Sequence, residues 1–150
     1  MAHTFTTLHT HVIFSTKDRA PFLDEAIRAR VFAYLGGIVR ELGGAAVRVN
    51  GVSDHVHMLL QLPSEVALAE CLRVVKTNSS RWVHETWPDR KKFAWQAGYG
   101  ASTVSTSSVG TVARYIERQA EHHRKVSFQD EFLAFLRKNA IEFDPGHLWD

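Results

Sequence analysis

The chain has 150 residues, a net charge of +2 and an isoelectric point near 8.9. This length predicts one domain with a real hydrophobic core, and the 45% hydrophobic and 23% charged fractions are ordinary for a globular protein. One cysteine, Cys71, excludes an intramolecular disulfide and a cysteine-based zinc site. Because no apolar stretch is long enough to span a membrane and the first residues show no secretory signal pattern, we expect a cytoplasmic protein.

Hydrophobic periodicity predicts eight elements. In chain order these are a strand over 5–15, a helix over 24–42, strands over 45–52 and 55–62, a helix over 64–85, a strand over 98–105, and helices over 109–123 and 127–138. Asp24 and Ser64 are predicted to cap the first two helices, and Gly43-Gly44 to end the first. A tight turn at Ser53-Asp54 is predicted to join the second and third strands as a hairpin.

The order β-α-β-β-α-β predicts an α+β fold with a ferredoxin-like antiparallel sheet, followed by C-terminal helices. We expect one domain over 1–150, with a core over about 5–125 and a C-terminal helix and tail over about 126–150. The first and third strands are central in that topology. The third strand carries His55-Val56-His57, so any chemistry of these histidines is predicted to lie in the middle of the sheet.

His55 and His57 share one face of the predicted strand because strand side chains alternate. Two imidazoles on an apolar strand need hydrogen bonds or a ligand, and neighbouring positions on one face suit chelation of a divalent metal. The alternative is a pair of polar histidines with no metal. Asp54 could orient one imidazole, but its position makes a plain turn residue the preferred interpretation.

Tyr115 and Gln119 lie four residues apart and therefore on one face of the predicted helix. A tyrosine hydroxyl can act as a nucleophile, and an amide oxygen can complete a metal site formed by two histidines. The alternative is a surface tyrosine on an amphipathic helix whose packed face includes Ala120. His122 and His123 follow one turn later, where a solvated helix end is the preferred interpretation.

Basic and hydroxyl side chains with a nearby tryptophan on the second helix suit contacts to phosphates and bases, although a plain solvated face is an equal alternative. Two further basic residues follow the first strand. The predicted DNA-binding residues are Lys17, Arg19, Arg73, Lys76, Asn78, Ser80 and Arg81.

Five stretches together resemble the single-tyrosine HUH transposases of the insertion-sequence-200/605 family, and they occur in the order found there. His55-Val56-His57 is similar to the family's His-hydrophobic-His signature, and Tyr115 with Gln119 to its Tyr-x-x-x-Gln signature. The stretches are residues 12–17, 50–57, 76–82, 96–100 and 115–119.

This resemblance implies a transposase that cuts and rejoins single-stranded DNA, with Tyr115 as the catalytic nucleophile forming a 5′-phosphotyrosine link. His55, His57 and Gln119 would hold Mg²⁺ or Mn²⁺. The implied partners are single-stranded DNA with subterminal hairpins and a second copy of the chain in a homodimer, with the protein at the nucleoid when bound to DNA. Ser102 to Gly110 is a small, polar segment that could let the tyrosine helix move.

Two other interpretations stay open at the level of sequence. The chain could be a catalytically silent protein of the same fold that binds single-stranded or hairpin DNA. It could instead be a metal-dependent hydrolase in which the histidines activate water and Tyr115 is structural.

Overall fold

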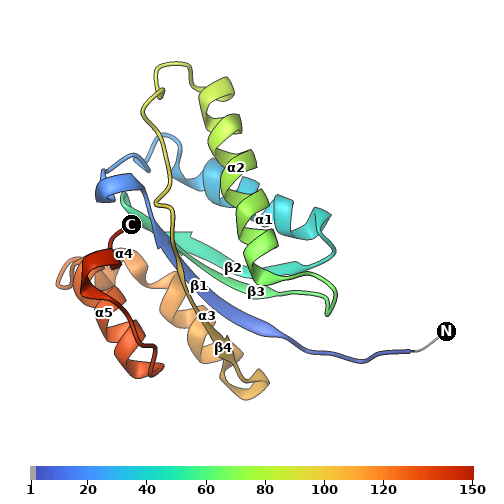
Figure 1. Cartoon of the computed structure of the whole chain (residues 1–150). Helices are drawn as coiled ribbons and strands as arrows, with labels where there is room; N and C mark the ends of the chain where they lie inside the picture. Colours follow the sequence, from blue (N-terminus) through green and yellow to red (C-terminus); the bar gives the residue numbers. More distant parts are fainter. Residues whose placement is uncertain (1–2) are drawn as a thin grey trace.

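A four-stranded antiparallel sheet with helices on both faces forms the centre of the protein in this computed structural model, which describes residues 3–150 (Figure 1). The elements are β1 (His9–Ser15), η1 (Lys17–Arg19), α1 (Arg28–Glu41), β2 (Ala45–Gly51), β3 (His55–Gln61), α2 (Leu68–Thr86), β4 (Gly100–Val104), η2 (Thr106–Ser108), α3 (Val109–Glu117), α4 (Gln119–His122), α5 (Phe128–Lys138) and η3 (Pro145–His147).

The strand order is β2-β3-β1-β4, and every neighbouring pair is antiparallel. The predicted α+β, ferredoxin-like class is confirmed, with β1 and β3 in the centre and β4 at one edge. In the β2–β3 hairpin the chain passes so closely that a Cβ on Gly51 would lie 2.1 Å from the His55 carbonyl oxygen. Only glycine fits there, and the tight turn sets the place where His55 enters the sheet.

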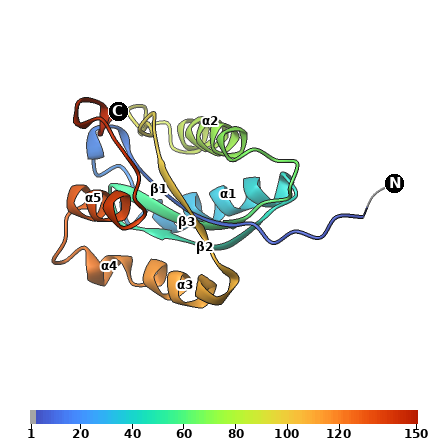
Figure 2. The same ribbon diagram turned by 60° about the horizontal axis from the view of Figure 1, so that its bottom comes forward.

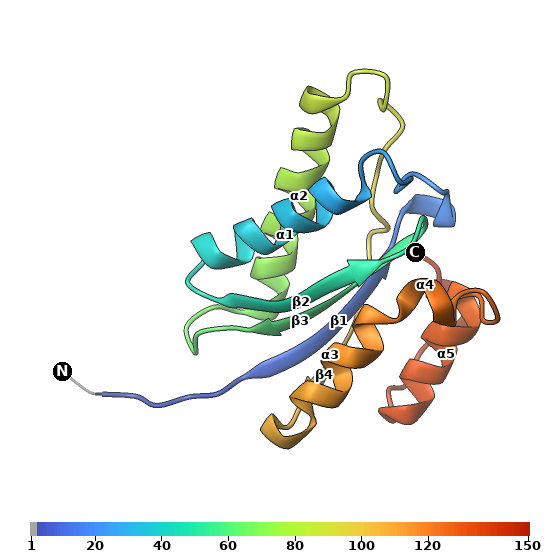
Figure 3. The ribbon, with the colours of Figure 1, turned by 180° about the vertical axis from the view of Figure 1, so that it is seen from behind.

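The two faces of the sheet carry different layers (Figures 2 and 3). Alternation along β1 and β3 turns Phe14 and Met58 toward α1 and α2, where the main apolar core lies. The alternate residues face the other way, so that Ile13 packs with α5 and Leu59 with α3. The helices after β4 therefore cover the face on which the predicted histidines lie.

The first two helices begin later than predicted. Asp24 does not cap α1, because its carboxylate accepts a hydrogen bond from the Ala26 amide, at 3.0 Å, and forms an ion pair with Arg90 instead. It closes a turn, and α1 starts at Arg28. Ser64 likewise lies in a turn that follows Pro63, and α2 starts at Leu68. Gly43, with φ of +87°, ends α1 as predicted.

The predicted helix over 109–123 is two helices, because the backbone leaves helical geometry at Arg118. This break changes which side chains face inward. Gln119 is fully buried, whereas Ala120, predicted to pack, is exposed. The break therefore turns a polar group, and not an apolar one, toward the histidines on β3.

The C-terminal segment closes the same face of the sheet. Phe128 and Phe132 of α5 are buried against Ile13, and the Trp149 ring packs beside both. Ser127 caps α5 by accepting a hydrogen bond from the Asp130 amide at 3.1 Å. Among residues 3–150, the structure has no helix both long enough and apolar enough to cross a membrane.

Candidate active site

His55 and His57 are buried side by side on β3, with 0% and 1% of their surface exposed. Their ring centroids are 5.3 Å apart. The strand period turns both toward α3, α4 and α5, as the spacing predicts. Two imidazoles in a dry interior need polar partners, and the structure supplies one for each ring nitrogen.

Each imidazole is held from behind through its Nδ1 atom. His55 Nδ1 lies 2.7 Å from an Asp54 carboxylate oxygen, and His57 Nδ1 lies 2.8 Å from Nε2 of His11 on β1. Both rings therefore present Nε2 to the same space, an arrangement typical of histidines that bind metals. Asp54 is thus more than a turn residue, which was the preferred interpretation of the sequence.

Tyr115 of α3 and Gln119 of α4 approach the histidines from the helical layer that covers this face of the sheet. The Gln119 amide oxygen accepts a hydrogen bond from His55 Nε2 at 3.0 Å. The Tyr115 ring centroid lies 5.7 Å from that of His57, and 36% of Tyr115 is exposed. The four residues singled out by the two sequence signatures thus meet in one chain, with the tyrosine beside its own histidines.

Glu131, which was not among the predicted site residues, lies at the centre of the site. Its Oε1 atom is 2.9 Å from His57 Nε2 and 3.2 Å from His55 Nε2. Its Oε2 atom accepts hydrogen bonds from the Tyr115 hydroxyl and, at 3.2 Å, from Gln119 Nε2. A signal for it was present, since Glu131 is the one charged residue on the buried stripe of α5.

His123 completes the cluster and was expected at a solvated helix end. It is largely buried, and its Nε2 atom lies 2.9 Å from Glu131 Oε1 and 3.0 Å from the Gln119 amide oxygen. Ligand atoms of His55, His57, His123 and Glu131 all lie within 4.8 Å of one another. Three imidazoles and a carboxylate, with an amide oxygen beside them, form a donor set that fits a divalent metal ion.

Burial and the central carboxylate shift the ionisation of the site. Burial alone would lower the pKa of His55, but hydrogen bonds to Asp54 and Glu131 outweigh it and raise that pKa to about 9. Burial lowers the pKa of His57 to about 4, in spite of the nearby Glu131. Burial and repulsion from His57 lower the pKa of His11 to about 3. At neutral pH, with no metal bound, His55 therefore carries a positive charge, whereas His57 and His11 are neutral.

The carboxylate and the phenol shift in opposite directions. Burial opposes ionisation of Glu131, but hydrogen bonds from His123, His55 and His57 hold its pKa far below the usual range. Burial and the hydrogen bond to Glu131 raise the pKa of Tyr115 above its usual range. In this state Glu131 is an anion and the Tyr115 phenol keeps its proton.

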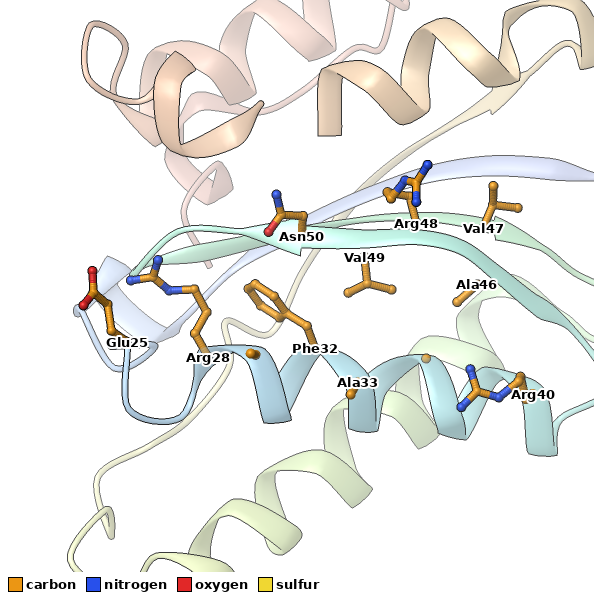
Figure 4. A pocket seen from close by; sticks show the side chains of 12 residues that line it. Glu25, Arg28, Phe32, Ala33, Arg40, Ala46, Val47, Arg48, Val49 and Asn50 are labelled. Atoms are coloured by element: carbon orange, nitrogen blue, oxygen red, sulfur yellow. The ribbon is translucent and has the colours of Figure 1, made fainter. Parts of the chain in front are cut away.

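Two residues of β2 anchor the helix that carries Tyr115. Asn50 Nδ2 donates to the carbonyls of Ile116 and Glu117 at 3.0 and 3.2 Å, and Arg48 forms a 2.8 Å ion pair with Glu117. Figure 4 shows Arg48 and Asn50 extending from β2 on the side away from α1, beside a groove between the two elements. The last carbonyls of α3, which lack helical partners, are thereby satisfied.

Five of the seven predicted DNA-binding residues lie on α2, which covers the face of the sheet opposite the histidines (Figure 3). Arg73 is exposed and pairs with Glu70 at 2.6 Å. Lys76 turns inward and donates to the carbonyls of Gln96, Ala97 and Gly98 at 3.0, 3.2 and 2.6 Å. The other three on α2 are Asn78 and Ser80, which are partly buried, and Arg81, which is exposed.

The remaining two predicted residues follow β1. Lys17 is exposed, whereas the Arg19 guanidinium lies 5.4 Å from the centre of the Trp149 ring. The structure therefore does not gather the seven residues around Tyr115. A DNA strand bound at Tyr115 would have to pass around an edge of the sheet to reach α2.

Comparisons of the sequence with known proteins agree with these motifs. The model of the family described as "Transposase IS200 like" matches residues 4–119. The chain is 28% identical over 134 residues to the transposase for insertion sequence element IS200 of Salmonella typhimurium, which covers 83% of this chain and 84% of the relative. It is 26% identical over 117 residues to the ISDra2 transposase TnpA of Deinococcus radiodurans, covering 75% and 84%.

Two solved structures share the fold. A protein of Deinococcus radiodurans R1 described as a transposase has a TM-score of 0.64 at 23% identity, over 79% of this chain and 95% of that one. A REP-associated tyrosine transposase bound to a REP hairpin has a TM-score of 0.62 at 14% identity, over 84% and 74%. The family match ends at Gln119, so His123 and Glu131 lie beyond it.

Proposed function

We propose that this chain, which belongs to the IS200-like transposase family, cuts and rejoins single-stranded DNA through Tyr115. The observation that carries the proposal is the convergence of the Tyr115 hydroxyl with the Nε2 atoms of His55 and His57 around Glu131, all within one chain. A nucleophile and a set of metal ligands at one place are what phosphodiester cleavage needs.

In the proposed step the Tyr115 oxygen attacks the scissile phosphorus and its phenolic proton passes to solvent, after Glu131 has positioned the hydroxyl through the hydrogen bond that it accepts. The bond from phosphorus to the 3′ oxygen breaks, leaving a 5′-phosphotyrosine and, once the oxygen takes up a proton, a free 3′-hydroxyl. A 3′-hydroxyl attacking the phosphotyrosine reverses the step. Because one phosphodiester replaces another, rejoining needs no external energy source.

The donor set supports a divalent metal as cofactor, held by His55, His57 and Gln119 as predicted and also by His123 and Glu131. When bound, Mg²⁺ or Mn²⁺ would polarise the scissile phosphate and offset its developing charge. Imidazole nitrogens suit transition metals better than Mg²⁺, which prefers oxygen ligands. We therefore expect Mn²⁺ to bind more tightly than Mg²⁺.

The proposed partner is single-stranded DNA carrying hairpins, in line with the REP hairpin bound to the tyrosine transposase of similar fold. The exposed basic residues Lys17, Arg73 and Arg81 are proposed to contact its backbone. A homodimer is proposed to form through the outer edge of β4, which is one of the two edge strands of the sheet. Acting on DNA, the protein would work in the cytoplasm, at the nucleoid.

A tyrosine placed beside its own histidines supports cleavage within one subunit. The anchors from Asn50 and Arg48 hold the tyrosine helix on its own sheet. In a dimer, each subunit would then carry a complete site. Mixing a Tyr115→Phe chain with a His57→Ala chain tests this arrangement, because cleavage within one subunit predicts no adduct from the mixture.

The test of the function uses labelled single-stranded DNA drawn from the sequence that flanks the gene, incubated with Mn²⁺ and run on a denaturing gel. A protease-sensitive adduct that is absent with Tyr115→Phe is expected. Hairpin binding by both proteins without any adduct would support the catalytically silent DNA-binding protein. Metal-dependent cleavage that survives in Tyr115→Phe would instead support the hydrolase.

A further inference from the structure

Two hollows of different character meet at the Tyr115 side chain. An apolar cleft of about 680 Å³ lies between α3 and α5, over β1 and β4. A basic hollow of about 520 Å³ runs along α3 and the chain that follows it. Tyr115 and His122 line both. The proposed nucleophile therefore lies at the boundary between a surface that suits bases and one that suits phosphates.

The walls of the apolar cleft suit a flat aromatic ligand. Val112 of α3 and Phe135 of α5 line it, and the His11 ring meets the Phe135 ring edge to face with centroids 5.3 Å apart. Stacking on such rings is how proteins hold the bases of single strands. The volume of the cleft also falls within the range of sites that take small organic ligands.

Polar side chains also line this cleft, among them a group at the junction of β4 and the end of α5. The Ser102 hydroxyl donates to the Asn139 side-chain oxygen at 2.6 Å, and the Asn139 side-chain nitrogen donates to the Phe135 carbonyl at 2.9 Å. These groups, together with Lys138, line the cleft and can exchange hydrogen bonds with a ligand that enters. A few polar groups in a mostly apolar pocket fix orientation and give specificity.

The basic hollow offers the complementary chemistry. Arg114, Arg118 and Lys125 line it, and all three side chains are exposed. Arginine and lysine neutralise phosphates without reading sequence. A strand with one phosphate at Tyr115 would thus find cations on one side of it and an aromatic cleft on the other.

We propose that the apolar cleft holds the base of a nucleotide next to the phosphate that Tyr115 attacks, while the basic hollow holds the adjoining backbone. This inference rests on the proposed function and adds a base-binding subsite to it. Each hollow contacts one part of the same nucleotide strand. The cleft therefore gives the protein a base preference beside the cut.

The test begins with a random-sequence library of single-stranded DNA. The library is incubated with the protein and Mn²⁺, covalent adducts are captured, and the captured and released fragments are sequenced. The wild-type protein is expected to prefer certain bases at one position beside the cut. Ala134→Trp, which places a ring in the cleft, should lose this preference, and Ala134→Ser is the matched control that should retain it.

An abasic oligonucleotide gives the quantitative readout. With the preferred sequence in hand, removing the base at that position should slow wild-type cleavage at least tenfold, the order expected for loss of one stacked base. Ala134→Trp should respond much less. Val104→Trp, which enlarges a β4 side chain on the cleft side of the sheet, provides a second variant if the first fails to fold.

The possible outcomes distinguish failure of the base-binding subsite from failure of tyrosine-mediated cleavage. Adducts that form with no base preference beside the cut, or a filled cleft that keeps the wild-type preference, would overturn the subsite. An unchanged rate on the abasic oligonucleotide would do the same. No adduct with any member of the library, under conditions where the protein is folded, would instead overturn tyrosine-mediated cleavage and the subsite with it.

Discussion

The Tyr115 hydroxyl donates its hydrogen bond to Glu131, a residue 16 positions further along the chain on α5. The same carboxylate accepts hydrogen bonds from His57 and His123, each at 2.9 Å. One side chain therefore joins the proposed nucleophile to the proposed metal ligands. This arrangement predicts that changes at Glu131 alter metal binding and cleavage together.

Replacing Glu131 with Gln should weaken binding of Mn²⁺ at least tenfold, because the change removes the only carboxylate of the cluster and keeps its size. Cleavage should fall with it, because less metal stays bound beside the scissile phosphate. Titration calorimetry with Mn²⁺ measures the first effect. Glu142→Gln, an exposed residue on the tail, is the control with the same change of charge. Equal Mn²⁺ affinities in the two variants would show that Glu131 is not a metal ligand.

Asp54→Asn should raise the Mn²⁺ concentration needed for cleavage by roughly 10- to 100-fold, because Asp54 orients the His55 ring from behind without touching the metal position. The maximal rate should return at saturating Mn²⁺, which separates a positioning role from a catalytic one. Cleavage rates measured across a series of Mn²⁺ concentrations give both quantities. Asp89→Asn, in the exposed turn after α2, should behave like the wild type. An unchanged Mn²⁺ requirement in Asp54→Asn would show that Asp54 forms only the turn and does not orient His55 for metal binding.

Asn50→Asp should loosen the tyrosine helix. The carboxylate cannot donate to the Ile116 and Glu117 carbonyls and would face them with a negative charge, so a loss of about 1–3 kcal/mol in unfolding free energy is expected. Cleavage at saturating Mn²⁺ should fall as well. Chemical unfolding and cleavage assays check the two effects. Asn78→Asp on α2 is the matched control for the stability measurement, and an Asn50→Asp variant no less stable than that control would refute the anchor.

The fold followed from the sequence because its main signals are local. Alternation marks β1 and β3 and helical spacing marks α2 and α5, so the order of elements is enough to predict the ferredoxin-like class. The starts of α1 and α2 were misplaced because Asp24 and Ser64 also favour turns, and tertiary partners such as Arg90 decide between the two. Such partners are distant in sequence and leave no local pattern.

The candidate site was predicted in part for the same reason. Two short signatures located His55, His57, Tyr115 and Gln119 because each pair shares one face of a single element. Glu131 reaches His57 across 74 positions, a contact that no local spacing encodes. A carboxylate on the buried stripe of α5 requires a buried polar partner, but the sequence does not show which residue that partner is.

Arg73→Ala should weaken binding of single-stranded DNA and reduce its salt dependence, if α2 contacts the backbone. Loss of one phosphate contact should lower the slope of the logarithm of affinity against the logarithm of salt by about 0.7. Fluorescence anisotropy over a range of salt concentrations measures this slope. The ion pair with Glu70 is exposed to solvent and should not mask the effect. Glu70→Ala is the control for loss of that pair, and an unchanged slope in Arg73→Ala would exclude this face of α2 from the interface.

Lys76 differs from Arg73 because its ammonium donates hydrogen bonds to three backbone carbonyls of the same chain. Burial lowers the pKa of Lys76 to about 8 from an ordinary value of 10.5. Between these two values the unfolded chain binds the proton and the folded chain releases it. The unfolded state then holds more protons, so this residue should make the free energy of unfolding rise with pH from about 8 to 10.5, and contribute no pH dependence below that window.

Lys76→Met keeps the length of the side chain and removes the titrating group. In urea unfolding at pH 7.5, 8.5 and 9.5, the unfolding free energy of the wild type should increase relative to that of the variant by roughly 1–3 kcal/mol over the window. Lys17→Met, at an exposed position, should follow the wild-type pH profile. Parallel profiles for wild type and Lys76→Met would show that Lys76 has the same pKa in the folded and unfolded chains. The Lys76 ammonium would then be accessible for the DNA contact predicted from the sequence.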